Sequence, residues 1–228
     1  MKILFFDLEN ATSKGGAKIC EFGYVVTDGS FSVTERGNYI INPNIRHDEW
    51  DWYVVRKVLT RKKNEYTKQP TFKDFYPQIR DLILSAYYVV GHSLDGDAKA
   101  INGECTRYDL PAIDYDYLDE RDVFLLFTDT KQQRSVANIL VDLGVEGDTT
   151  EHDAEADAYN TMIGFRAMLE RSGLSLEDFC RRYAAAKGRS ENYRVILQGK
   201  KNKTRRHRSR AHHGERTEKP ASPRNGNA

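Results

Sequence analysis

A near-continuous apolar run at the start of the chain, KILFFD (residues 2–7), is the feature that most constrains the fold. Such a run is typical of a strand that is covered on both faces, which means a central strand of a sheet. Two further runs, ICEFGYVVTD (19–28) and FSVTERGNYIINP (31–43), lie on either side of the turn signal Asp28-Gly29. They predict two more strands in a hairpin meander, so the fold should open with three adjacent strands.

The remainder of the chain alternates helical patterns with short strands. Helices are expected at 46–63, 71–87, 97–107, 134–144, 154–169 and 176–187, and strands at 88–91 and 113–118. This order indicates one α/β layer fold. We expect a mixed five-stranded sheet, with three antiparallel strands followed by parallel strands, flanked by helices.

The composition excludes a membrane protein. No stretch approaches the roughly 20 apolar residues that a membrane helix needs, and the start of the chain lacks the length and the small-residue cleavage site of a signal peptide. The three cysteines, Cys20, Cys105 and Cys180, are scattered and odd in number, which indicates neither a disulfide framework nor a zinc site. We therefore expect a soluble, cytoplasmic protein with reduced, mostly buried thiols.

The net charge of +1 conceals an acidic body and a basic tail. Residues 200–228 hold ten Lys or Arg and two Glu, whereas residues 1–199 hold 25 Lys or Arg and 32 Asp or Glu. A segment with so few large apolar residues cannot offset its ordering entropy by burial. We expect one domain over residues 1–190 and a basic, disordered tail over 191–228, which is either a solvated end or a phosphate-binding arm.

Acidic residues gather at three junctions of the predicted elements. At the end of the first strand, Asp7 and Glu9 stand two positions apart and project to the same side. After the strand at 88–91, Asp95 and Asp97 lie where α/β sheets place their sites. Taken alone, each pair also fits a plainer interpretation, because acids are common at strand exits and Asp is a favoured helix N-cap.

The third junction is the stretch TEHDAEADA, residues 150–158. On a continuous helix, His152 and Asp157 would lie about 140° apart around the axis. Both can serve one centre only if His152 precedes the helix and Asp157 lies within it. Asp153 and Glu155 fit an ordinary helix start, where acids favour the positive end of the helix dipole.

The three junctions, taken in this order, resemble the DEDDh group of 3′-to-5′ exonucleases, whose fold is ribonuclease H-like. The resemblance spans roughly residues 1–172. FDLEN carries the first motif with Asp7 and Glu9, GHSLDGD carries the second with Asp97, and HDAEAD carries the third with His152 and Asp157.

The chain departs from the family's pattern at three positions. Asn10 stands where the first motif usually has Thr, and Ser93 and Gly96 replace the Asn and Phe of the second motif. The acids are retained, but the register of the second motif is weaker. Asp95 therefore remains the alternative to Asp97.

Converging carboxylates need a cation among them, because a like-charged pair at about 4 Å costs roughly 4 kcal/mol at an effective dielectric of 20. Hard divalent cations suit an all-oxygen site, so two Mg²⁺ or Mn²⁺ are expected and zinc is disfavoured. In this interpretation Asp7, Glu9, Asp97 and Asp157 ligate metal, and His152 is the general base toward a water that attacks phosphorus. The resemblance implies release of nucleoside 5′-monophosphates from a 3′ end.

The expected partner is a single strand or 3′ end of DNA or RNA, and the basic tail would hold this strand or tether a polymerase or repair partner. Trp50 and Trp52 either stack on bases or, as is more common for large aromatics, pack in the core. A catalytically silent nucleic-acid or protein-binding module of the same fold is the alternative function. A third alternative is a structural α/β domain whose acids are accidental.

Overall fold

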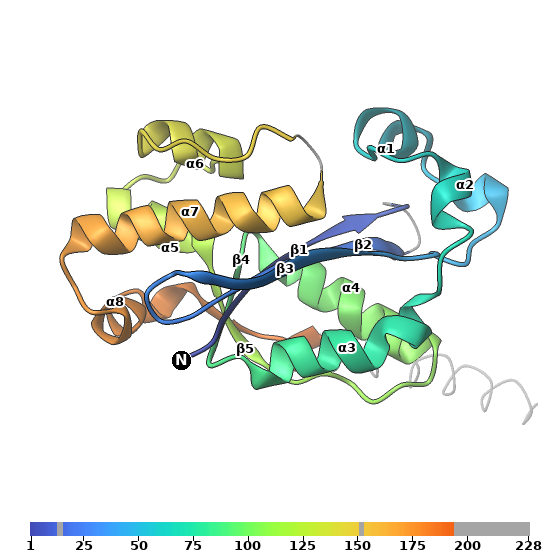
Figure 1. Ribbon diagram of the computed structural model, residues 1–228, viewed down its shortest axis with the longest axis horizontal. Helices are drawn as coiled ribbons and strands as arrows, with labels where there is room; N and C mark the ends of the chain where they lie inside the picture. The colour runs from blue at the N-terminus through green and yellow to red at the C-terminus, as the bar shows by residue number, and fades with distance from the viewer. Residues whose placement is uncertain (13–15, 151–152, 194–228) are drawn as a thin grey trace, which may run out of the picture. The chain divides into compact units, whose positions relative to one another are not determined.

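The computed structural model describes residues 1–12, 16–150 and 153–193, and all of these residues belong to one compact unit. Its centre is a six-stranded sheet in the order β3-β2-β1-β4-β5-β6 (Figure 1). The strands are β1 (Ile3–Asn10), β2 (Ile19–Thr27), β3 (Val33–Ile40), β4 (Tyr88–Gly91), β5 (Asp116–Asp119) and β6 (Lys187–Arg189). Because β1 pairs antiparallel with β2 and parallel with β4, the opening apolar run is a central strand.

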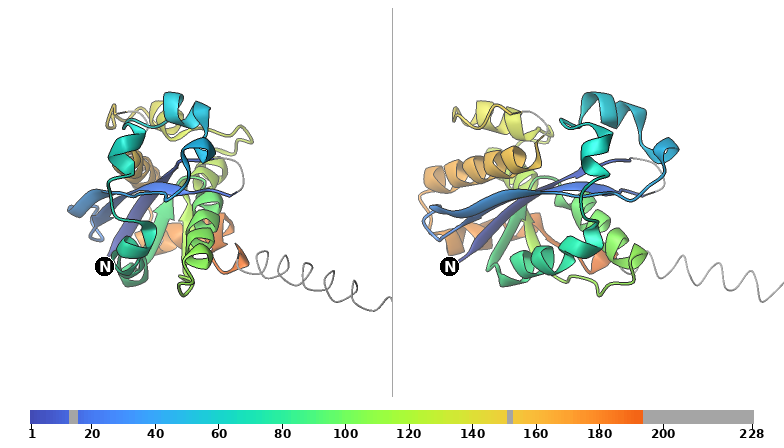
Figure 2. Two further views of the ribbon diagram at one scale, coloured as in Figure 1. Left: turned by 90° about the vertical axis from the view of Figure 1, so that its right-hand side faces the viewer. Right: turned by 45° about the vertical axis from the view of Figure 1, so that its right-hand side comes forward.

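Helices cover both faces of the sheet (Figures 1 and 2). The α-helices of the described residues are α1 (Trp52–Lys57), α2 (Lys63–Tyr66), α3 (Phe72–Ser85), α4 (Leu94–Arg107), α5 (Glu120–Thr128), α6 (Val136–Asp142), α7 (Ala154–Ser172) and α8 (Leu176–Arg182). One apolar cluster joins the sheet to α3 and α4, and a second joins it to α5, α6, α7 and α8. Within the described ranges, no helix combines the length and the apolar character needed to cross a membrane.

Alternation along β1 divides its side chains between the two clusters. Leu4 and Phe6 belong to the cluster with α3 and α4, whereas Ile3 and Phe5 belong to the cluster with α7. Successive side chains of a strand point to opposite faces. The odd-numbered positions that follow, Asp7 and Glu9, therefore continue the face that α7 covers.

The α/β fold with its mixed sheet is confirmed, but the expected number of strands was too low. The helix expected at 176–187 ends at Arg182, and residues Lys187–Arg189 pair antiparallel with β5 as a sixth strand. Gly188 favours this ending. A Cβ at Gly188 would lie 2.2 Å from the Tyr117 ring, and glycine is unfavourable inside a helix.

Two other segments differ from expectation. The helix expected at 46–63 is a short 3₁₀ turn (His47–Glu49) followed by α1 and α2. The helix α5 was not expected at all. It follows β5 without a loop, and the Asp119 side chain caps it by accepting hydrogen bonds from the backbone N–H groups of Arg121 at 3.1 Å and Asp122 at 3.4 Å.

Gly23 lets the start of α7 approach the sheet. It is the cross-strand partner of Asp7 in β2, and a Cβ at this position would lie 1.9 Å from the carbonyl carbon of Ala154. Only a residue without a side chain fits this contact. The first turn of α7 therefore rests directly beside the end of β1.

We predict that Gly23→Ala destabilises the protein because backbone atoms of α7 cannot move aside as a flexible side chain would. The expected loss is about 1–3 kcal/mol or more in the free energy of unfolding, measured by urea denaturation. Gly103→Ala is the control, since Gly103 lies within α4 and an added Cβ meets no atom within 4 Å. The control should gain roughly 0.5–1 kcal/mol, and equal losses in both variants would contradict the close approach of α7.

Candidate active site

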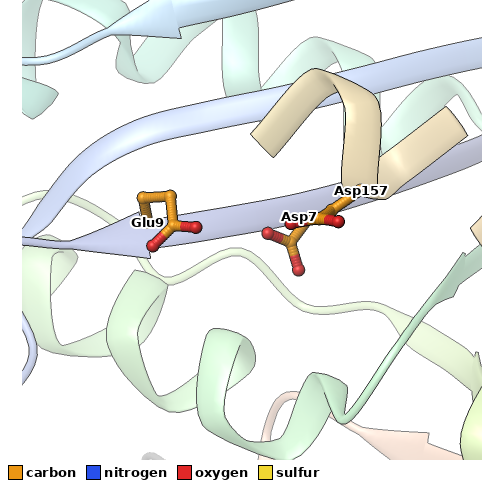
Figure 3. Close-up of side chains that lie close together, drawn as sticks. All are labelled: Asp7, Glu9 and Asp157. Carbon is orange, nitrogen blue, oxygen red and sulfur yellow. The ribbon is translucent and has the colours of Figure 1, made fainter. Parts of the chain in front are cut away.

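The end of β1 and the first turns of α7 bring three carboxylates together (Figure 3). Asp7, Glu9 and Asp157 each offer a carboxylate oxygen, and these oxygens lie within 4.8 Å of one another. Asp7 and Asp157 are partly buried, and Glu9 is 9% exposed. This cluster of three acids, here called the acid cluster, is made from residues 150 positions apart in sequence.

The N-terminus of α7 is fixed by its cap. The Asp153 side chain accepts hydrogen bonds from the backbone N–H groups of Glu155 at 3.1 Å and Ala156 at 3.3 Å, and Arg36 from β3 forms an ion pair with Glu155. Asp157 follows one turn later, with its N–H bonded to the Asp153 carbonyl at 2.9 Å. The bland interpretation of Asp153 as a helix-start acid is therefore confirmed, while Asp157 faces β1.

A fourth acid, Asp97, approaches from the first turn of α4. The start of α4 is held by Asp119, whose carboxylate accepts from the N–H groups of Ser93 at 3.1 Å and Leu94 at 2.9 Å. Burial raises the pKa of Asp97 well above its usual value, and the charges of Asp7, Asp119 and Glu9 raise it further. Asp97 thus lies within electrostatic reach of the acid cluster.

Asp95 has a different environment. It is exposed, and its carboxylate accepts a hydrogen bond from the Tyr117 hydroxyl. Its carboxylate is therefore held by Tyr117 of β5. Of the two candidates in the second motif, the geometry favours Asp97.

The carboxyl groups of Asp7 and Glu9 have raised pKa values. Burial raises the pKa of Glu9 to about 9, with further increases from the charges of Asp7 and Asp157. Burial also raises the pKa of Asp7 well above its usual value, as do the charges of Asp157 and Glu21. These carboxyl groups are costly to ionise together, and a divalent cation among them would remove that cost.

Sequence reasoning missed a second layer of charge behind the acid cluster. Glu21 of β2 is fully buried and is the cross-strand partner of Glu9. Its carboxylate accepts hydrogen bonds from Arg61 at 2.8 Å, Asn38 at 2.6 Å and the Tyr66 hydroxyl. A single Glu inside the otherwise apolar run ICEFGYVV was the signal that such a partner exists.

Arg61 links this layer to α7. Besides its bond to Glu21, its guanidinium forms an ion pair with the Asp153 cap at 3.4 Å. Arg61 comes from the segment between α1 and α2, so one side chain joins three parts of the chain. Partly buried His92 and fully buried Glu120 form another pair that the sequence did not suggest, with 2.9 Å between Nδ1 and Oε2.

The two tryptophans have different environments. Trp50 is 7% exposed and packs with Ala11, Cys20 and Tyr66, so the core interpretation holds for it. Trp52 is 64% exposed and lines a surface cavity of about 590 Å³ together with Thr12 and Lys18.

His152, predicted as the general base, lies outside the described residues.

The donor set fits a hard divalent cation. The acid cluster offers only carboxylate oxygens, without a cysteine or a histidine among its three members. Oxygen ligands of this kind suit Mg²⁺ or Mn²⁺ better than zinc. Asp7, Glu9 and Asp157 are the described residues that would hold such an ion, with Asp97 beside them.

The mixed sheet, with the acid cluster at the end of its central strand, is the arrangement that the resemblance to a ribonuclease H-like exonuclease implies. Residues 4–165 match the family model of the RNase T exonucleases. This match covers more than half of the chain, so the chain belongs to that exonuclease family, and the resemblance to DEDDh exonucleases is confirmed. No curated protein sequence gives a match.

Solved structures of nucleases share the fold at low sequence identity. The nuclease domain of 3′hExo, a DEDDh family member bound to rAMP, is 16% identical with a TM-score of 0.64, over 77% of this chain and 94% of its own. E. coli Exonuclease I in complex with a dT13 oligonucleotide is 17% identical with a TM-score of 0.59, over 75% of this chain and 41% of its own.

A 3′-exonuclease that recognises the 3′ end of a histone mRNA stem-loop is 17% identical with a TM-score of 0.62, over 74% of this chain. This chain spans 64% of the length of that exonuclease. At these identities the likeness shows the fold, and the family match carries the assignment to the nucleases.

We predict that the metal-free protein loses stability as the pH rises. The folded state keeps a proton on Glu9 up to a pKa of about 9, whereas the unfolded chain releases it near 4.5. Since the folded state binds more protons in this window, the free energy of unfolding should fall between about pH 4.5 and pH 9. Urea denaturation in EDTA across this range measures the slope.

Glu9→Gln should flatten this slope and make the metal-free protein more stable at pH 8. The matched control is Glu177→Gln, because Glu177 is exposed on α8 and should leave the slope unchanged. A Glu9→Gln variant with the parent's slope would show that Glu9 does not carry the excess proton.

Proposed function

We propose that this protein is a divalent-metal-dependent 3′-to-5′ exonuclease that releases nucleoside 5′-monophosphates. The observation that carries the proposal is the convergence of Asp7, Glu9 and Asp157 within 4.8 Å. A fold that brings acids from the two ends of a domain together against their own repulsion is typical of a metal site. The chain belongs to an exonuclease family, and exonucleases hydrolyse phosphodiester bonds.

In the proposed mechanism Asp7, Glu9, Asp97 and Asp157 would hold two Mg²⁺ or Mn²⁺. When bound, these ions would polarise the attacking water and stabilise the departing oxygen. His152 takes the proton of the water as its oxygen bonds to phosphorus, and the bond from phosphorus to the 3′-oxygen of the preceding nucleotide breaks. That oxygen leaves as a 3′-hydroxyl after gaining a proton from solvent.

Several features support a nucleic-acid 3′ end as the substrate. The cavity beside Trp52 borders Thr12, which lies two residues beyond the end of β1 and three beyond Glu9. An exposed indole offers a face on which a base can stack. Since related folds are solved with rAMP and with dT13, we propose either DNA or RNA as the substrate.

The three cysteines are buried and form no disulfide. This fits the reducing conditions of the cytoplasm, which we propose as the working compartment. We propose one domain over residues 1–190 and a basic tail over 191–228, of which residues 194–228 lie outside the described ranges. We propose that the tail either holds the substrate strand or tethers a polymerase or repair partner.

We predict that the protein shortens a 5′-labelled oligonucleotide stepwise in Mg²⁺ or Mn²⁺ and is inactive in EDTA. Asp7→Ala, His152→Ala and Asp97→Asn should each lower the rate by at least about 100-fold, because each removes a metal ligand or the base. Asp95→Asn is the matched control for Asp97→Asn and should retain most activity. A parent protein that fails to shorten the strand would be the silent module instead. Equal shortening by the parent and by Asp7→Ala would show that the acid cluster does not carry the activity.

We predict that a chain ending at residue 199 binds single strands more weakly and with a shallower salt dependence, while its turnover at saturating substrate is retained. The physical reason is that the removed residues carry a net charge of +8, and each phosphate contact adds to the salt slope. Fluorescence anisotropy at several salt concentrations measures both quantities. An unchanged slope would exclude the tail from strand binding and leave the tethering role.

A further inference from the structure

The segment from Trp52 to Lys63 carries five cations and no acid. The cations are Arg56, Lys57, Arg61, Lys62 and Lys63. The body around this segment is acidic, with 32 Asp or Glu against 25 Lys or Arg in residues 1–199. We call these five side chains the cationic strip.

The charges of the cationic strip are mostly unopposed. Arg56, Lys57 and Lys62 are exposed, and none of them forms an ion pair with a described residue. Other surface arginines are paired with acids, as Arg80 is with Asp81 at 2.7 Å. A concentration of unopposed positive charge on an acidic body favours an anionic partner.

The cationic strip is tied to the acid cluster. Arg61 bonds to Glu21, the cross-strand partner of Glu9, and to the Asp153 cap of α7. At the other end of the segment, the N–H of Asp51 donates to the carbonyl of Ala11 at 3.1 Å. Figures 1 and 2 show α1 and α2 at the end of the sheet where β1 finishes and α7 begins. The segment that carries the cations therefore lies at the end of the sheet that holds the acids.

Two of these cations lie over aromatic rings. The guanidinium of Arg56 lies 5.1 Å from the Trp52 ring centroid, and the ammonium of Lys63 lies 5.5 Å from that of Trp50. Trp52 and Tyr53 are 64% and 62% exposed. Proteins that bind single-stranded nucleic acids combine cations along the phosphate backbone with exposed aromatic rings, on which the unpaired bases stack.

We propose that the cationic strip holds the phosphates of a single nucleic-acid strand upstream of the 3′ end that enters the acid cluster. The direction of the strand rests on the proposed exonuclease function, whereas the binding itself does not. Arg61, whose charge is shared with Glu21 and Asp153, fixes the strip in place. Lys57 and Lys62 form no ion pair with a described residue, and their ammonium groups contact the phosphates directly.

The test is the affinity of the full chain for 5′-fluorescein single strands of about 20 nucleotides, made as DNA and as RNA. Fluorescence anisotropy in EDTA reports binding without hydrolysis. In Lys57→Gln/Lys62→Gln, loss of two phosphate contacts should reduce the slope of log affinity against log salt by about 1.4. Affinity should then fall roughly 25-fold at 0.1 M salt and converge with the parent near 1 M.

The matched control is Lys73→Gln/Lys131→Gln. Both lysines are exposed, on α3 and after α5, and their loss changes the net charge by the same amount. The control should keep the parent's affinity and slope on both strands. Equal effects of the two double variants would mean that net charge alone acts, and would overturn the proposal.

An unchanged affinity in Lys57→Gln/Lys62→Gln would also overturn the proposal and leave an acidic protein as the partner of the strip. A loss confined to DNA or to RNA would overturn phosphate contact as the cause, because both strands carry the same phosphates. If the strip variant binds weakly as predicted but the parent digests no strand in Mg²⁺ or Mn²⁺, the exonuclease function fails and the strand-binding surface stands.

Discussion

Repulsion between carboxylates is the constraint on which the rest of this structure depends. Asp7, Glu9 and Asp157 offer oxygens within 4.8 Å of one another, and burial together with these neighbours raises the pKa of Glu9 to about 9. Nothing in the stability of the metal-free domain favours such an arrangement. The scaffold must therefore hold the acids in place, and each supporting contact has a recognisable physical form.

The supports come from every element around the acid cluster. The missing side chain of Gly23 admits the first turn of α7, and the Asp153 cap fixes where that turn begins. The Asp119 carboxylate fixes the start of α4, the helix that carries Asp97, by accepting hydrogen bonds from the N–H groups of Ser93 and Leu94. Behind Glu9, Arg61 compensates the buried charge of Glu21. The same arginine extends the support to the segment that carries the cationic strip.

Much of the fold and of the acid cluster was predictable from local patterns. The apolar run before Asp7 indicated a central strand, and two-residue alternation placed Glu9 on the same face. Helical spacing after Ala154 placed Asp157 beside the apolar stripe of α7. These predictions depend only on the periods of strands and helices.

The remainder depended on contacts that no local pattern contains. The Arg61–Glu21 pair joins residues 40 positions apart, and the sequence near either residue does not indicate the other as its partner. The sequence pattern did not indicate α5, because Asp119 is both the last residue of β5 and the N-cap of α5, with no loop between them. The sixth strand pairs with β5 where Gly188 passes close to the Tyr117 ring, a tertiary contact that only a residue without a side chain permits.

We propose that this repulsion is retained because divalent cations relieve it. Calorimetric titration of the protein with Mn²⁺ near pH 8, repeated in buffers of different ionisation enthalpy, tests the claim by counting the protons released as the metal binds. The account predicts saturable binding with net proton release, because a carboxyl group with a pKa of about 9 must ionise to become a ligand. Binding without proton release, or no saturable binding, would contradict it.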